Sequence, residues 1–387
     1  MGLTRFVRPR DSAQKPMSVL NFKIPQSWCR LPGILTVAWF ALLFATDAVA
    51  QSALFTPEQK ARLIELTRQD PVAKAEFAKL QALADAALSA TPNPIKKIQT
   101  EGKLAGDPVK IATETAFRDM RALFALGYAY EITGETKYAE KTRAFILAWA
   151  ETNQPTGDPI DETSLEPLLV AYDQTRATFP ADARTAADRY LHKIVAAEWG
   201  ARQVTNNWQS HRLKIIGLAA YVLRDETQIA RALQGFKDQI AVNLNADGSS
   251  LDFRDRDALH YHVYDLEPLL TLAITAQNHG LNLYDYPGKD GASLRRSVHF
   301  LIPFCIGERE HHEFVNSKVA FDRKRAANGE KAYQVGRLFR PEEGFKALSL
   351  AAFLDHSVDP VVTKLAGQNT NHMGAWTLIL VRAGREK

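Results

Sequence analysis

Two short clusters of polar residues carry the side-chain types that acid–base chemistry uses. The first cluster, residues 205–212 (TNNWQSHR), stands at the start of an apolar stretch that is typical of a helix. Asn206 or Asn207 is a natural N-cap for this helix, because its side-chain oxygen can accept a free backbone N–H of the first turn. Residues three and four apart share a helix face, so His211 shares a face with both Asn207 and Trp208. The alternative interpretation is purely structural, with an asparagine that caps the helix, a tryptophan that packs in the core and a histidine on the surface.

The second cluster, residues 254–264 (RDRDALHYHVY), follows a turn and precedes an apolar helix. It gathers two arginines, two histidines and two tyrosines, namely Arg254, Arg256, His260, His262, Tyr261 and Tyr264. A tyrosine can act as a base only after it loses its proton, and neighbouring arginines favour that anion. The alternative is a solvated charged loop with stacked aromatic rings.

These residue types indicate one kind of reaction better than others. The chain has no HExxH, CxxC, P-loop or GxSxG pattern, so metalloprotease, kinase and α/β-hydrolase chemistry find no support. A glycosidase would use two carboxylates, whereas Asn, His, Arg and Tyr suit elimination from a uronic acid polymer. Neutralising the uronate carboxylate stabilises the enolate-like transition state that forms when the C5 proton leaves. A tyrosine or histidine removes that proton, and a tyrosine can protonate the departing O4. This chemistry implies no metal and no cofactor.

At these residues the sequence resembles the alginate lyase superfamily of α/α-toroid polysaccharide lyases. The resemblance rests on Arg254, on residues 258–262 (ALHYH) and on residues 266–269 (LEPL), and it covers most of residues 90–280. It implies an incomplete α/α toroid that cleaves β-1,4-linked polyuronate by β-elimination and leaves 4,5-unsaturated uronate ends. The implied substrate is alginate, in its polymannuronate form, or glucuronan.

The resemblance also implies roles for single residues. Asn207 matches an asparagine that neutralises the substrate carboxylate, and Tyr261 matches a tyrosine that acts as acid and base. Arg254 matches the arginine seven residues before that tyrosine. Trp208 stands where related enzymes have a catalytic histidine, and His211, one turn later, offers an imidazole to the same cleft. We therefore expect Asn207, His211, Arg254 and Tyr261 to be the catalytic residues.

Several loops carry basic residues that can bind a polyanion. Residues 93–112 are interrupted by proline and glycine and are typical of a long exposed loop, and the part 93–103 resembles the lid loop of the family. Further basic loops occur at 318–331. We expect basic side chains from these loops to converge on one positive groove. The expected substrate-binding residues are Trp208, His260, Lys96, Lys97, Lys103, Arg256 and Arg340, with Arg254, Arg323 and Arg325 in the same groove. The alternative is that these side chains are scattered and solvated.

Helical segments must position all of these residues. Residues 56–59 (TPEQ) carry the signals of a helix start. Apolar residues then recur at helical spacing over 57–68, 72–89, 113–133, 136–150, 163–178, 183–200, 207–223, 225–243, 265–280, 342–355 and 359–366. A tetratricopeptide-like solenoid would repeat about every 34 residues, and the hairpin at 113–150 does not recur at that spacing. Because strand signals are few and no linker interrupts the chain, we expect one all-α domain over 51–387, an incomplete α/α toroid built of helix hairpins.

The first fifty residues are typical of an export signal. An apolar run at 31–46 follows basic residues and precedes Ala48-Val49-Ala50, so we expect a signal peptide over residues 1–50, cleaved after Ala50. A membrane anchor is the alternative, but the run is shorter than the ~20 residues that a span needs. Cleavage leaves Cys305 as the only cysteine, so no internal disulfide can form. We expect a periplasmic or secreted protein.

Composition and net charge limit the classes of binding partner that we expect. The 387-residue chain is 46% hydrophobic and 24% charged, an ordinary globular balance. Residues 1–50 hold six of the 48 basic and two of the 44 acidic residues, which leaves 42 of each and no net charge. We therefore expect an acidic polysaccharide substrate, no nucleic acid, no membrane contact after signal cleavage, and a monomer. Two rivals stay open, a non-catalytic periplasmic helical protein that binds glycans or peptides, and a lyase for a sulfated glycosaminoglycan.

Overall fold

Within residues 52–369 and 372–385, which the computed structural model describes, every regular element is helical. Extended pairing is limited there to two isolated β-bridges, Leu244 with Ser250 and His312 with Leu338. The prediction of an all-α chain is confirmed. The predicted signal peptide lies outside the described residues. In the part of the chain that is described, no helix is long and apolar enough to cross a membrane.

Most helices follow one another with short connections, and long ones join α2 to α3, α12 to α13, α13 to α14 and α14 to α15. The first half contains α1 (Pro57–Gln69), α2 (Pro71–Ser89), α3 (Pro108–Ala116), α4 (Arg118–Thr133), α5 (Thr136–Thr152), α6 (Pro159–Glu162), α7 (Glu166–Thr175), α8 (Ala181–Gly200) and α9 (Asn207–Leu223). The second half contains α10 (Glu226–Asn243), α11 (Leu251–Arg256), α12 (Leu259–Asn278), α13 (Leu294–Ile306), α14 (Ala320–Ala327), α15 (Phe345–Ala351), α16 (Asp359–Asn369) and α17 (His372–Gly384). Short 3-10 turns lie between them: η1 (Thr163–Leu165), η2 (Arg176–Thr178), η3 (Lys289–Gly291), η4 (Lys331–Tyr333), η5 (Pro341–Gly344) and η6 (His356–Val358).

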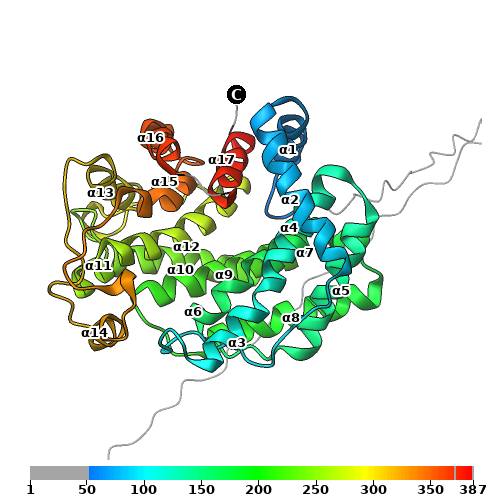
Figure 1. Ribbon diagram of the computed structural model, residues 1–387, viewed down its shortest axis with the longest axis horizontal. Coiled ribbons are helices and arrows are strands. Elements are labelled where there is room, and N and C mark those ends of the chain that lie inside the picture. The colour runs from blue at the N-terminus through cyan, green and yellow to red at the C-terminus, as the bar shows by residue number, and fades with distance from the viewer. Residues whose placement is uncertain (1–51, 370–371, 386–387) are drawn as a thin grey trace, which may run out of the picture. The chain divides into compact units, whose positions relative to one another are not determined.

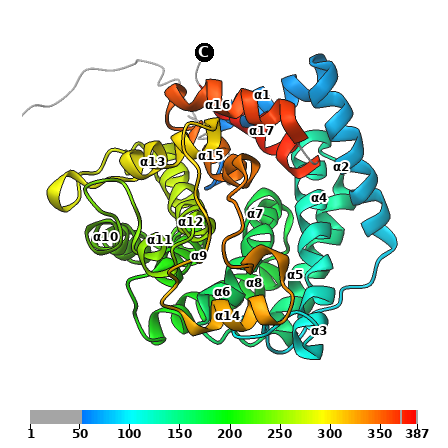
Figure 2. The same cartoon turned by 60° about the vertical axis from the view of Figure 1, so that its left-hand side comes forward.

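Helices that are far apart in the sequence pack side by side in a ring (Figure 1). α4 packs on α7, α7 on α9, α9 on α12 and α12 on α15, and α17 connects α15 to α1 and α2. A second set packs against this inner series: α5 contacts α4, α7 and α8, both α8 and α10 contact α9, and α13 contacts α12. Figure 2 shows α10 and α13 on the outer side of α9 and α12. This is an incomplete α/α toroid, because the chain between α13 and α15 supplies only the short α14 and 3-10 turns instead of a further hairpin.

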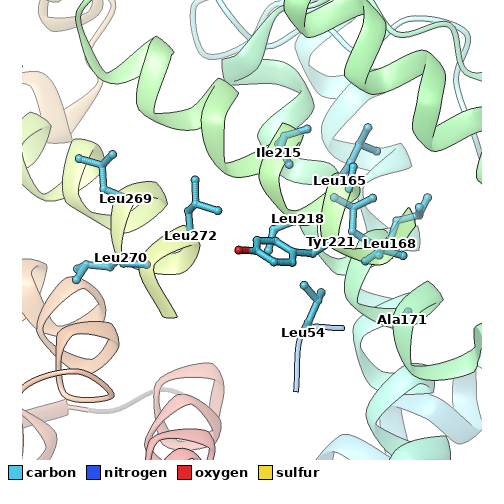
Figure 3. Close-up of a cluster of buried hydrophobic side chains, with 14 of the residues drawn as sticks. Leu54, Leu165, Leu168, Ala171, Ile215, Leu218, Tyr221, Leu269, Leu270 and Leu272 are labelled. Atoms are coloured by element: carbon cyan, nitrogen blue, oxygen red, sulfur yellow. The ribbon is translucent and has the colours of Figure 1, made fainter. Parts of the chain in front are cut away.

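Apolar side chains of the inner helices form the core of the ring (Figure 3). Side chains from η1 and α7, from α9 and from α12 meet there, namely Leu165, Leu168, Ala171, Ile215, Leu218, Tyr221, Leu269, Leu270 and Leu272. α9 is buried around nearly its whole circumference, and its buried charges Arg212 and Lys214 are paired with Glu198 and Glu166. Each fully buried leucine stabilises the fold by about 1.5–3 kcal/mol. Gly217 allows α12 to come close, because a Cβ atom there would lie 2.5 Å from a methyl group of Leu272.

Most helix boundaries agree with the sequence. Thr56 and Gln59 form the predicted capping box of α1, and α9 spans the predicted residues 207–223. The predicted helix 113–133 is two helices, α3 and α4, which meet at Phe117. The expectation of basic loops at 318–331 is corrected in part, because this segment contains α14.

Candidate active site

The second polar cluster covers the end of α11 and the first turns of α12 instead of forming a loop. α12 starts at Leu259, six residues before the predicted start, although Ala258 at its N-cap offers no side-chain hydrogen bond. The carboxylate of Glu313 supplies the cap, since it accepts the backbone N–H of Leu259 at 2.7 Å and that of His260 at 3.1 Å. Tyr261 therefore lies in the first turn of α12.

Two arginines surround the side chain of Tyr261, which is only 5% exposed. Arg325 donates a hydrogen bond of 2.8 Å to the phenol oxygen. The guanidinium carbon of Arg256 lies 3.8 Å from the ring centroid, and Asp322 holds this arginine through an ion pair of 2.6 Å. Burial raises the pKa of Tyr261, and the charges of Arg256 and Arg325 oppose that rise. The two arginines thus stabilise the anion of a buried phenol.

Arg325 is itself held by aromatic rings. It lies on α14, and its guanidinium carbon is 4.5 Å from the ring centroid of Phe321 and 4.4 Å from that of Tyr333. Glu330, just after α14, comes within 4.0 Å of its Nε atom. Because the planar guanidinium is fixed on its faces, its N–H groups point to defined partners.

The loop between α2 and α3, which includes the predicted lid, is joined to this segment. The backbone N–H of Ala105 donates to Glu330 at 3.0 Å. A carboxylate oxygen of Asp161 accepts the backbone N–H of Thr100 at 2.6 Å and that of Glu101 at 2.9 Å. The loop is therefore fixed at α6 and at the segment that carries Arg325, while its role as a lid stays a prediction.

His211 faces the inside of the ring from α9. Its ring centroid lies 4.2 Å from that of Tyr264 on α12, and the ring centroid of Tyr264 lies 6.4 Å from that of Tyr261. The hydroxyl of Thr163 lies 2.8 Å from Nδ1, whereas Nε2 makes no hydrogen bond with any described residue. Burial lowers the pKa of His211 well below its ordinary value, so the imidazole is neutral at pH 7.

A cavity of about 460 Å³ extends from His211 and Tyr264 into the ring. Two ion pairs cross its wall: Lys214 with Glu166 at 2.6 Å and Lys346 with Glu267 at 2.5 Å. The charges of both lysines lower the pKa of His211 further. Farther along α9 and α12 the lining is mostly apolar and includes Leu54, Phe55, Leu218, Ile274, Leu350 and Phe353.

Asn207 lies one turn before His211 and is fixed by a buried carboxylate. Its backbone N–H donates to Asp252 at 2.7 Å, and its side-chain amide donates to the other oxygen of the same carboxylate. Burial raises the pKa of Asp252, and the hydrogen bonds from Asn207 lower it. An amide nitrogen carries two N–H donors, so this contact sets the direction of the second one.

The other aromatic candidates differ in their placement. Trp208 is half-buried in the first turn of α9, next to Asn207. The ring of His260 stands perpendicular to that of Tyr261 at 5.1 Å, and burial lowers its pKa to about 4. His262 is a fully buried core histidine.

Arg254 is not brought to Tyr261. Its side chain is half exposed, donates to Ser249 at 2.9 Å and forms an ion pair of 2.9 Å with Asp247. Residues two apart on a helix point in different directions, so on α11 Arg256 faces Tyr261 and Arg254 faces the 247–249 turn. The structure does not bring Arg254 to Tyr261, and its expected role at this site stays a prediction.

The basic side chains do not converge as one group. Arg256 and Arg325 meet at Tyr261, whereas Lys96, Lys97, Arg323 and Arg340 are exposed and Lys103 is half-buried. Arg340 pairs with Glu342 and Glu343, and Lys103 pairs with Asp107. Acidic groups also lie near Arg325: burial and the charges of Asp158 and Asp161 raise the pKa of Glu101, and Arg325 lowers it. The surroundings of Tyr261 carry charges of both signs.

The arrangement combines a proton-transfer group with donors for an anion. The phenol of Tyr261 lies between two guanidinium groups, and a neutral imidazole lies two rings away. Sequence reasoning did not assign a role to Tyr264, although its spacing of three from Tyr261 on one helix was a local signal. Among the residues that the structure describes, no group of three or more His, Cys, Asp or Glu is placed to hold a metal ion.

Comparisons with known proteins agree with this architecture. A family model described as alginate lyase matches residues 65–312. An alginate lyase from Bacteroides ovatus is similar in structure, with a TM-score of 0.65, 17% identity and coverage of 86% of this chain and 99% of that one. Alginate lyase A1-III from a Sphingomonas species has a TM-score of 0.50, 19% identity and coverage of 77% and 95%. A variant of alginate lyase A1-III in complex with a tetrasaccharide has a TM-score of 0.51, 22% identity and coverage of 66% and 77%. No curated protein matches the chain.

Proposed function

Because this chain belongs to the alginate lyase family, and so is a polysaccharide lyase, we propose that it cleaves a β-1,4-linked polyuronate of the alginate type by β-elimination. Polymannuronate is the proposed substrate. Each cleavage leaves a 4,5-unsaturated uronate at the new non-reducing end. The solved structures that resemble the chain are named as alginate lyases, which supports this substrate class.

The placement of Tyr261 between Arg256 and Arg325 carries the proposal. As a phenolate, Tyr261 removes the C5 proton of the uronate. The electron pair of the C5–H bond forms the C4–C5 double bond, and the bond between C4 and O4 breaks. The phenol then returns its proton to the departing O4. Both arginines support the first step, because they stabilise the phenolate in a buried place.

We assign neutralisation of the substrate carboxylate to Arg325, Asn207 and His211. Arg325 offers N–H groups to an anion beside the phenol. Asn207 offers the amide N–H that Asp252 leaves free, and His211 offers the Nε2 edge of a neutral imidazole. We assign no part of this task to Arg254, whose guanidinium is bound to Asp247.

We also propose that the protein is exported and acts in the periplasm or outside the cell, on the basis of the sequence of residues 1–50. Family membership does not favour the rival of a non-catalytic helical binding protein. Nothing in the comparisons favours glucuronan or a sulfated glycosaminoglycan.

The test is an activity panel with the purified protein. Polymannuronate, polyguluronate, glucuronan, a sulfated glycosaminoglycan and an uncharged glucan are incubated in parallel, and absorbance of the unsaturated product is followed. We expect a signal with polymannuronate. A signal with glucuronan alone would overturn the substrate, and no signal with any polyuronate would overturn the proposed function.

A further inference from the structure

A second cavity, of about 290 Å³, lies on the outer side of the ring between α8 and α10. One wall is a stripe of α10 formed by Arg231, Gln234, Gly235, Asp238 and Val242, which share a face through their spacing of three and four. Gln209 of α9 also lines it, whereas His211, two positions later, lines the inner cavity. The two cavities are therefore on different sides of α9.

The outer cavity contains an arginine that stacks on a tryptophan. The guanidinium carbon of Arg231 lies 3.8 Å from the ring centroid of Trp199. The indole N–H of Trp199 donates to Gln228 at 2.9 Å, which fixes the ring. Arg231 is exposed, and no carboxylate of the described residues lies within ion-pair distance of it. Because stacking fixes the guanidinium plane without using its N–H groups, these groups are prepared for an anion.

The rest of the lining suits a sugar. Gln234 donates to Asp238 at 2.9 Å, so donor and acceptor groups for hydroxyls stand together beside Arg231. Gly235 allows α10 to pack closely on α9 at this wall, because a Cβ atom there would lie 2.5 Å from a methyl group of Leu213 and 3.8 Å from the edge of Trp199. Apolar surface comes from Trp199 and Val242. Carbohydrate sites combine such apolar patches with a few directed polar groups.

The cavity is also connected to the first turn of α9. Gln239 lines it, and its side-chain amide donates to the carbonyl groups of Thr205 and Asn206, each at 3.2 Å. These residues immediately precede Asn207. A polymer held at Arg231 is therefore anchored on the helix end that carries the candidate site.

We propose that this outer cavity is a second, non-catalytic binding site for a uronate unit of the same acidic polysaccharide. Arg231 binds the carboxylate, and Gln234 and Asp238 bind hydroxyl groups. The site retains long chains beside the enzyme between cleavages and is not needed for short ones. This inference rests on the proposed function for the identity of its ligand.

The test separates binding from cleavage. Arg231→Ala is compared with Lys193→Ala, which removes an exposed positive charge from α8 outside the cavity. Each change is placed in a Tyr261→Phe background, and affinity for long polymannuronate is measured by electrophoresis in gels that contain the polymer. We expect Arg231→Ala to weaken binding about tenfold, the loss of one charge-assisted contact, and Lys193→Ala to leave it unchanged.

Kinetics supply the second measurement. With Tyr261 intact, Arg231→Ala should raise KM for the long polymer several-fold and leave kcat and KM for a tetrasaccharide unchanged. Equal polymer affinity of the Arg231 and Lys193 variants, or equal retention on an uncharged glucan gel, would overturn the second site. If binding is measurable and depends on Arg231 but no protein with Tyr261 intact cleaves the polymer, the proposed function is overturned and the second site is retained.

Discussion

Arg325 donates a hydrogen bond of 2.8 Å to the phenol oxygen of Tyr261, although the two residues lie 64 positions apart in the chain. Tyr261 falls within residues 65–312, which match the alginate lyase model, whereas Arg325 lies beyond them on α14. A tyrosine from the family segment is thus held by a charge from a segment outside it. Changes on α14 should therefore alter proton transfer at a residue that they do not replace.

Replacing Tyr261 with phenylalanine should nearly abolish cleavage. The change removes only a hydroxyl group, and loss of general acid–base catalysis lowers kcat by about 10²–10⁴. Circular dichroism and Tm should remain close to those of the wild type. Tyr286→Phe, which removes the same group from another part of the molecule, serves as control. A Tyr261→Phe variant that keeps more than about a tenth of wild-type kcat would contradict the proton-transfer role.

Replacing Arg325 with alanine should lower kcat and shift its pH dependence. A lost charge-assisted hydrogen bond of about 1.5–3 kcal/mol corresponds to roughly a 10–100-fold lower rate. Without this positive charge the pKa of Tyr261 rises, so the alkaline rise of kcat should move to higher pH. Arg254→Ala is the matched control and should leave the pH profile in place, because Arg254 is bound to Asp247. The reverse result, a shift with Arg254→Ala and none with Arg325→Ala, would restore the role that the sequence implied for Arg254.

Local sequence signals predicted the helices and much of the candidate site. An N-cap at Asn206 or Asn207 predicted the start of α9, whose N-cap is Asn206, and the spacing of four predicted a shared face for Asn207 and His211. These predictions need only the period of a helix. They place residues that lie within a few positions of one another.

Contacts between distant segments could not be predicted in this way. The resemblance singled out Arg254 as catalytic, whereas the packing of Asp322 beside α11 holds Arg256 against Tyr261. The early start of α12 depends on Glu313, which caps it from 54 residues away. Arg325 was one of several basic residues in one stretch, and its neighbours Arg323 and Lys324 are exposed. Contacts between segments that are far apart in the sequence fix the positions of these residues, and the helical period carries no information about such contacts.

Replacing Glu313 with alanine should strongly destabilise the protein. Glu313 is fully buried, caps α12 and forms an ion pair of 3.3 Å with Arg337. Removing Glu313 leaves the backbone N–H groups of Leu259 and His260 without their acceptor, and each such loss costs about 1–3 kcal/mol. Arg337 keeps its ion pair with Glu343. Urea unfolding at pH 8 measures this loss. Glu342→Ala, which breaks an exposed pair with Arg340, should change the unfolding free energy by less than about 1 kcal/mol, and equal losses in the two variants would contradict the cap.

His262 should make the fold sensitive to mild acid. Its Nε2 atom lies 3.0 Å from the carbonyl oxygen of Ser297, which can only accept, so the proton is on Nε2 and Nδ1 accepts from Ser250. Burial lowers the pKa of His262 to about 4 from the ordinary value of 6.5. Above pH 6.5 the ring is neutral in both states and the full stability is present.

As the pH falls from 6.5 towards 4, the unfolded chain binds a proton at residue 262 and the folded chain does not. The unfolding free energy should therefore decrease by about 3 kcal/mol through this group. His262→Gln retains a donor to Ser297 and has no titrating ring. Urea unfolding of both proteins at pH 7.5 and pH 4.5 isolates the contribution, because all other titrating groups are common to the pair. The wild type should lose about 3 kcal/mol more than the variant between these pH values, and equal losses would show that His262 is not held neutral by the fold.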